Sequence, residues 1–158
     1  MEQDEKYTNK LGAYPCIYMT LKDVNDSNYE NMLLNMKTAV LEMYQEHRYL
    51  LESDKIYPEE KEQIKDILWC KENETTLKNS IKNLSEYLSR HFNKKVMLFL
   101  DEYDVPLQNA YVKGYYEKAV EFFKTFYGVT FKDNQYIEKT VITGVSRVAK
   151  ESIFSRSK

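Results

Sequence analysis

Hydrophobic positions along this chain change their spacing several times, and each spacing predicts a kind of element. Short runs of apolar and β-branched residues predict buried strands at residues 14–21, 96–100 and 139–143. Elsewhere apolar residues recur every three or four positions, as on one face of a helix, which predicts helices over 27–51, from 58, from 75 or 76, and over 111–127. Strands separated by helices predict an α/β fold whose parallel sheet is covered on both faces.

Local signals indicate where these helices begin and end. Ser27 and Glu30 have the spacing of a capping box, and Pro58 suits the first turn of a helix. Thr75 or Thr76 is the expected cap of the next helix. Two further signals are a predicted loop around Pro106 and a predicted helix end at Gly128.

The length and composition favour one globular domain. The chain has 158 residues, of which 42% are hydrophobic and 30% charged, a balance unlike that of disordered or membrane proteins. Its longest strongly apolar run, Val96 to Leu100, is far shorter than the roughly 20 residues that a spanning helix needs. The acidic first residues have no signal-peptide character, so a cytoplasmic location is expected.

Charge, cysteine and histidine patterns exclude several kinds of site. The net charge is −2, and the only small basic cluster, Asn93 to Lys95, is too short to neutralise several phosphates, which disfavours direct nucleic-acid binding. Cys16 and Cys70 lie far apart with no CxxC pairing, so buried or idle thiols are expected. His47 and His91 have no ligand at metal spacing and are expected at the surface or at helix ends.

The strongest chemical signal is a hydrophobic run that leads directly into acids. Val96 to Leu100 is followed by Asp101, Glu102 and, two positions on, Asp104. In parallel α/β sheets ligands bind beyond the carboxyl ends of the strands, where a buried strand would hold Asp101 rigidly. Asp101 could then hold a magnesium ion through its waters, and Glu102 could orient or deprotonate an attacking water. The plain alternative is that these acids only end the strand in solvent.

Further segments form a pattern together with this acidic strand end. They are Tyr14-Pro15 before Ile17 to Thr20, Lys22 to Val24, His47 to Ser53, Asp101 to Asp104 with Pro106, Thr143 to Arg147, and Lys150 to Ser155. Together they resemble the bacterial AAA-ATPase-like proteins, and the resemblance covers nearly the whole chain. Members of that family usually carry this ATPase-like core before a PD-(D/E)XK nuclease-like region.

The resemblance implies a fold, a cofactor and site residues. It implies a partial P-loop NTPase-type (ASCE) parallel sheet of about three strands flanked by helices, working with ATP and Mg²⁺. It makes Asp101 and Glu102 the Walker B pair, with Asp101 on the metal, and Thr143 the sensor-1 residue. Arg147, with Lys150 after it, follows the last strand and could approach a γ-phosphate or a partner subunit's nucleotide, although both also suit a solvated helix start.

The chain departs from the family in one respect that affects activity. A phosphate-binding loop has the pattern G-x-x-x-x-G-K-[ST], and none of the four glycines fits it. In the family this loop precedes the Tyr14 region, and the resemblance ends after Ser155. Residues 1–158 are therefore expected to be a single truncated domain, the Walker B and sensor-1 part, with little or no hydrolysis alone.

Two other functions and one association remain open from the sequence. The chain could be a noncatalytic interaction or regulatory module whose acids meet no nucleotide. A metal-dependent nuclease built on Asp101, Glu102 and Asp104 is less favoured, because its nearest acid-x-lysine pattern, Glu59 to Lys61, lies on a predicted helix. If the family's first strand is missing beside the strand at 139–143, that edge stays unpaired, so self-association or a complementing chain region is expected.

Overall fold

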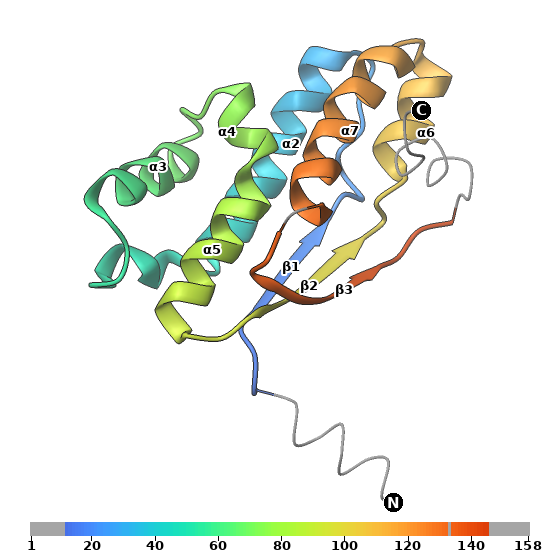
Figure 1. Ribbon diagram of the computed structural model, residues 1–158. Coiled ribbons are helices and arrows are strands. Elements are labelled where there is room, and N and C mark those ends of the chain that lie inside the picture. The colour runs from blue at the N-terminus through green and yellow to red at the C-terminus, as the bar shows by residue number, and fades with distance from the viewer. Residues whose placement is uncertain (1–11, 133, 146–158) are drawn as a thin grey trace, which may run out of the picture.

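Three parallel strands form the sheet of the computed structural model, which describes residues 12–132 and 134–145. They are β1 (Cys16–Thr20), β2 (Val96–Asp101) and β3 (Ile137–Ile142), with β2 in the centre (Figure 1). The predicted strands at 14–21, 96–100 and 139–143 each overlap one of them. The α/β class is confirmed, and the sheet is consistent with the partial P-loop-type fold that the resemblance implied.

Within residues 12–132 and 134–145, seven helical segments accompany the sheet. They are α2 (Tyr29–Gln45), the 3-10 helix η1 (Arg48–Glu52), α3 (Pro58–Leu68), α4 (Glu74–Lys78), α5 (Ser80–Phe92), α6 (Val105–Lys113) and α7 (Tyr116–Phe131). In Figure 1, α2, α5 and α7 stand on the same side of the sheet, with α3 and α4 beside them. None of the described helices is long and apolar enough to cross a membrane.

The two faces of the sheet differ in how well they are covered. Paired residues of parallel strands point to the same face, and successive residues alternate between faces. On one face Leu98 and its neighbours are buried beneath the helices. On the other, Tyr18, Phe99 and Val141 are paired in register, and Tyr18 remains 59% and Val141 38% exposed. Among the described residues the sheet is covered on one face only, not on both as the sequence predicted.

Helix α7 contributes the largest aromatic group of the core. Phe122, Phe123, Phe126 and Tyr127 are each at most 1% exposed. Their rings meet in a chain, with centroids 5.0 Å apart for Phe122 and Phe123 and 5.3 Å apart for Phe126 and Tyr127. Such spacings are favourable for aromatic pairs and add to the burial of large apolar surfaces.

Burial explains why α7 does not end where the glycine signal predicted. Gly128 lies inside α7, which continues to Phe131 because Thr130, one turn beyond Phe126, is fully buried. The Thr130 hydroxyl donates to the Phe126 carbonyl at 2.7 Å. A buried face thus carries the helix past a residue that often ends one.

Pro106 also proved to be a helix signal rather than a loop signal. It lies in the first turn of α6, which the sequence analysis missed, and a proline there loses no helical hydrogen bond. The predicted caps were close but displaced. The caps that the structure shows are Asn28 for α2, bonded to the Asn31 N–H, and Asn73 for α4, bonded to the Thr76 N–H.

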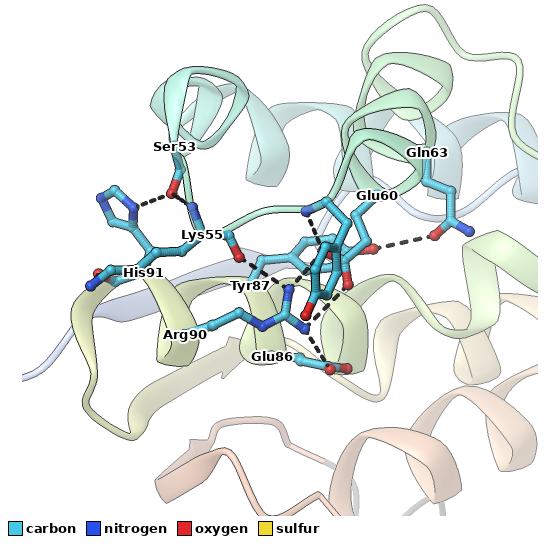
Figure 2. A network of polar contacts seen from close by, with 9 residues as sticks. Ser53, Lys55, Glu60, Gln63, Glu86, Tyr87, Arg90 and His91 are labelled. Carbon is cyan, nitrogen blue, oxygen red and sulfur yellow. Dashed lines mark hydrogen bonds and ion pairs between the residues drawn. The ribbon is translucent and has the colours of Figure 1, made fainter.

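A network of polar contacts centred on Arg90 joins α3 to α5 (Figure 2). The Arg90 guanidinium donates to both oxygens of Glu60, at 2.6 and 3.2 Å, and to Glu86 at 2.9 Å. It also lies 5.0 Å from the centroid of the Tyr57 ring. Beside this network, the Ser53 hydroxyl and His91 Nδ1 are 2.7 Å apart. His91 lies in the last turn of α5, which confirms the expected position at a helix end.

Both cysteines and the tryptophan are exposed, so the thiols are of the idle kind that the sequence left open beside the buried kind. Cys16 and Cys70 are both free and exposed, so neither is a buried thiol. Trp69 is 70% exposed. It follows the last residue of α3, Leu68, at the C-cap position.

Glu72 is an acid buried in the connection between α3 and α4. It is 3% exposed, and neither carboxylate oxygen makes a good hydrogen bond to the described residues. Burial raises the pKa of its carboxyl above the ordinary value, while its own backbone N–H and Lys37 offset this only in part and Asp66 adds to it. Lys37 donates to the Glu72 carbonyl at 2.8 Å rather than to the carboxylate.

Replacing Glu72 by glutamine should therefore stabilise the protein near neutral pH. The folded state binds the proton more tightly than the unfolded state, so stability falls as the pH rises from about 4.5 through the raised pKa. We expect Glu72→Gln to increase the free energy of unfolding by about 1 kcal/mol at pH 7.5 and to have little effect at pH 4. Urea unfolding at both pH values measures this. An equal stabilisation at pH 4 and pH 7.5 would contradict this prediction. Glu62→Gln, at an exposed position, is the control and should leave the free energy of unfolding almost unchanged at both pH values.

Candidate functional site

The carboxyl ends of the three strands meet at one edge of the sheet. Thr20 of β1 pairs with Asp101 of β2, and the Thr143 N–H donates to the Leu100 carbonyl at 2.9 Å. The Leu21 N–H donates to the Asp101 carbonyl at 3.0 Å, so the backbone of Asp101 is bonded to the neighbouring strand. Parallel strands thereby bring together residues that lie far apart in the sequence.

The Asp101 side chain lies on the open face of the sheet, between two hydroxyl groups. The Thr143 hydroxyl donates to Asp101 Oδ1, and the Tyr18 hydroxyl lies 3.5 Å from Oδ2, a long contact. Tyr18 and Thr143 come from the two strands that flank β2. The carboxylate is half-buried and retains acceptor sites for further partners.

Glu102 departs from the alternation of the strand. In a continuing strand its side chain would point into the buried face, but its backbone adopts a left-handed conformation with φ 53°. That conformation costs a non-glycine residue on the order of 1 kcal/mol. The strand ends there, and the Glu102 side chain is exposed at the same edge as Asp101. The two acids are adjacent yet point differently, as two separate roles would require.

Asp104 differs from the other acids in being buried. It is 1% exposed, and its Oδ2 accepts from the Val145 N–H at 2.9 Å and from Gln108 Nε2 at 3.1 Å. One residue earlier, the Tyr103 N–H donates to the Thr143 carbonyl at 3.2 Å. The segment after β2 is thus bonded directly to the segment after β3.

The structure brings together three of the residues that the sequence singled out, namely Asp101, Glu102 and Thr143. Arg147 and Lys150 lie outside the described residues. Sequence reasoning missed Tyr18. Strand alternation could have found it, because Tyr18 and Thr20 occupy the same face of β1 and Thr20 pairs with Asp101.

The geometry does not favour the nuclease alternative. Within residues 12–132 and 134–145, no group of three or more histidines, cysteines and acids is placed to hold a metal. Asp104 is buried against Val145 and Gln108, away from solvent. Glu60 lies on α3, as predicted, and binds Arg90, so the Glu59 to Lys61 pattern lies on a helix rather than a strand.

The oxygen atoms at this edge fit a magnesium ion held mainly through water. Magnesium prefers oxygen ligands and is usually bound by one or two carboxylates while it keeps several waters. Asp101 supplies a carboxylate on the open face, the Thr143 hydroxyl orients it, and Glu102 is exposed beside it. The sequence contains no G-x-x-x-x-G-K-[ST] loop to hold the phosphates. The side chains at this edge could therefore hold a hydrated metal ion and orient a water molecule, and the sequence offers no loop of the kind that binds phosphates.

Among the comparisons with known proteins, one found a match. A family model described as "Predicted AAA-ATPase", AAA-ATPase-like, matches residues 1–154. No curated protein and no solved structure matches the chain.

Proposed function

Because the chain belongs to the AAA-ATPase-like family, we propose that it supplies the metal-handling and water-handling acids of an ATP-hydrolysing site. Membership in the family implies nucleotide binding. The observation that carries the proposal is the hydrogen bond from the Thr143 hydroxyl to Asp101, which joins the ends of two neighbouring strands at the edge where parallel sheets bind ligands.

Each residue at the edge has a distinct role in this proposal. Asp101, the Walker B aspartate, holds the waters around Mg²⁺, and a bound Mg²⁺ would neutralise charge on the nucleotide phosphates. Glu102 orients or deprotonates the attacking water, for which its exposed and separately directed carboxylate is suited. Thr143, at the sensor-1 position, orients Asp101. Arg147, which lies outside the described residues, is proposed to serve the γ-phosphate or a neighbouring subunit's nucleotide.

A metal titration followed by NMR tests this proposal. Substoichiometric Mn²⁺ should broaden the amide signals of Asp101, Glu102 and Gly144 before those of Val96 and Ile137, which begin β2 and β3 at the opposite edge. We expect Asp101→Ala to abolish the selective broadening. Affinity of about millimolar is sufficient, since one carboxylate with waters binds weakly.

An exposed acid near the same edge provides the control for this titration. Asp23→Ala removes an aspartate from the turn after β1 and should leave the broadening unchanged. Broadening centred on other acids, or unaffected by Asp101→Ala, would contradict the proposal. ATP hydrolysis by the chain should stay at background because the phosphate-binding pattern is absent. Turnover that Asp101→Ala removes would mean that another feature holds the phosphates.

A second copy of the chain is the proposed partner of the uncovered part of the sheet. Among the described residues β3 is an edge strand, and such strands present unpaired backbone N–H and C=O groups to other chains. Val141 of β3 is 38% exposed on the open face next to Phe99. Self-association through β3 is compatible with the proposed nucleotide site. It would become an alternative function, that of a noncatalytic interaction module, only if Asp101 and Glu102 meet no nucleotide.

Sedimentation velocity measures this association directly. The wild-type chain should form dimers or larger species as its concentration rises, and Val141→Lys should shift it toward monomer by placing a charge on the edge strand. Leu34→Lys is the matched control, because Leu34 is 60% exposed on helix α2. A wild-type chain that stays monomeric at every concentration would refute the prediction.

A further inference from the structure

We propose that Asp104 is a positioning residue, which fixes the segment after β3 so that Thr143 stays bonded to Asp101. This inference rests on the proposed function for its catalytic meaning, since it concerns the residue that orients the metal-binding acid. Its structural part is independent of nucleotide chemistry. The partner of Asp104 is the chain's own backbone, at the point where β3 leaves the sheet.

The first argument is how Asp104 uses its carboxylate. Asp104 occupies the N-cap position of α6, where an aspartate usually accepts a hydrogen bond from the first turn of the helix. Here its side chain makes no capping bond. Its Oδ2 instead accepts the Val145 N–H, 41 residues away in the sequence, and the Gln108 side chain. A hydrogen bond to an ionised acceptor is stronger than a neutral one.

The second argument is the close approach of Gly144. A Cβ at position 144 would lie 2.7 Å from Asp104 Oδ1 and 2.6 Å from Cδ1 of the Tyr103 ring. Real Cβ atoms do not approach other atoms so closely, so only glycine allows this contact. Tyr103 and Asp104 therefore pack directly on the backbone between Thr143 and Val145.

The third argument is that Asp104 itself is firmly held. The Tyr127 hydroxyl, on the buried face of α7, donates to the Tyr103 carbonyl at 2.8 Å. Burial raises the pKa of Tyr127 well above its ordinary value, with smaller contributions from Tyr103 and Asp104, so this hydroxyl keeps its proton and remains a donor. Core packing of α7 thereby reaches the segment that carries Asp104.

These contacts bracket Thr143 from both sides. The residues before Thr143 belong to β3, which pairs with β2. The Thr143 carbonyl accepts from the Tyr103 N–H, and the Val145 N–H after it donates to the Asp104 carboxylate. With its backbone fixed, the Thr143 hydroxyl is directed at Asp101 Oδ1. Loss of the Val145 bond should let the Thr143 side chain sample other rotamers, and Asp101 should lose its orientation.

The test compares two independent ways of breaking this contact. Asp104→Ala removes the acceptor, and Gly144→Ala pushes the two segments apart while the carboxylate remains. In both we expect amide exchange of Val145 to accelerate at least about tenfold, and couplings that report the Thr143 side-chain torsion to change from one rotamer to an average. Asp104→Asn retains an acceptor oxygen and should restore most of the protection. The control, Asp23→Ala, should change neither signal.

The outcomes separate this inference from the proposed function. Unchanged Val145 exchange and an unchanged Thr143 rotamer in folded Asp104→Ala or Gly144→Ala would overturn the positioning role. If the torsion averages as expected, Mn²⁺ broadening at Asp101 should weaken severalfold in Asp104→Ala and recover in Asp104→Asn. Absence of Mn²⁺ binding in the wild-type chain would refute the proposed function alone, because exchange and couplings are measured without metal.

Discussion

Truncating Tyr127 to alanine should lower the free energy of unfolding by about 3–5 kcal/mol, a large part of the 5–15 kcal/mol typical of a domain. Tyr127 is 1% exposed, and its ring lies between those of Phe123 and Phe131, with centroids 5.5 and 5.9 Å away. Its removal leaves a cavity that surrounding side chains fill only in part, and it leaves the Tyr103 carbonyl without its donor. Urea unfolding followed by circular dichroism measures the loss.

A second variant separates the ring from its hydroxyl. Tyr127→Phe keeps the ring packing and removes the hydroxyl that donates to the Tyr103 carbonyl, so a loss of about 1–2 kcal/mol is expected. Tyr111, at 75% exposed, provides the control, since Tyr111→Ala should change stability by less than about 0.5 kcal/mol. If Tyr127→Ala cost no more than Tyr111→Ala, the aromatic core described for α7 would be wrong.

Removing the charge of Arg90 should cost about 2–3 kcal/mol. Arg90→Met keeps an apolar stem over the Tyr57 ring but removes the bonds to Glu60 and Glu86. The Glu60 side chain is only 17% exposed, so its carboxylate loses its partner in a place that water reaches poorly. The hydrogen bond to Glu60 raises the pKa of Arg90 most, burial opposes it, and the charges of Glu60 and Glu86 add to the rise, so the charged guanidinium is favoured.

The salt dependence of this loss distinguishes it from a surface effect. Lys65 and Glu62 form an ion pair at 2.9 Å whose side chains are 50% and 70% exposed. Lys65→Met should therefore lower the free energy of unfolding by less than about 0.5 kcal/mol, and this loss should vanish in high salt. The Arg90→Met loss should persist in 1 M NaCl. Equal losses for the two variants in unfolding experiments would mean that the Arg90 network contributes no more than an exposed pair.

Much of the fold could be predicted because its local signals and its packing agree. The run from Val96 to Leu100 is apolar throughout, and it forms the central strand. The predictions failed where a long-range contact decided the outcome. Gly128 stays helical because its neighbours are buried. Asn79 is a local exception: its side chain donates to the Thr75 carbonyl at 2.9 Å, and it separates α4 from α5 where periodicity predicted one helix.

The candidate site was predictable in part for the same reason. Asp101 and Glu102 are visible because they follow a buried strand directly, and their separate directions depend only on the local backbone of Glu102. Tyr18 and Asp104 gain their roles from residues 83 and 41 positions away, Asp101 and Val145. No local pattern encodes such pairs, since they follow from strand order and register.

The central position of β2 also has a consequence for the order in which the chain folds. Its partners in β3 lie roughly 40 residues away along the chain, and those in β1 roughly 80. Each doubling of a closed loop costs about 0.6 kcal/mol of chain entropy, so the β2–β3 pairing is entropically the cheaper one to form first. The part from β2 to β3, which contains Asp101 and Thr143, can therefore assemble before β1 joins it, and docking of β1 should be the slow, topology-limited step of folding.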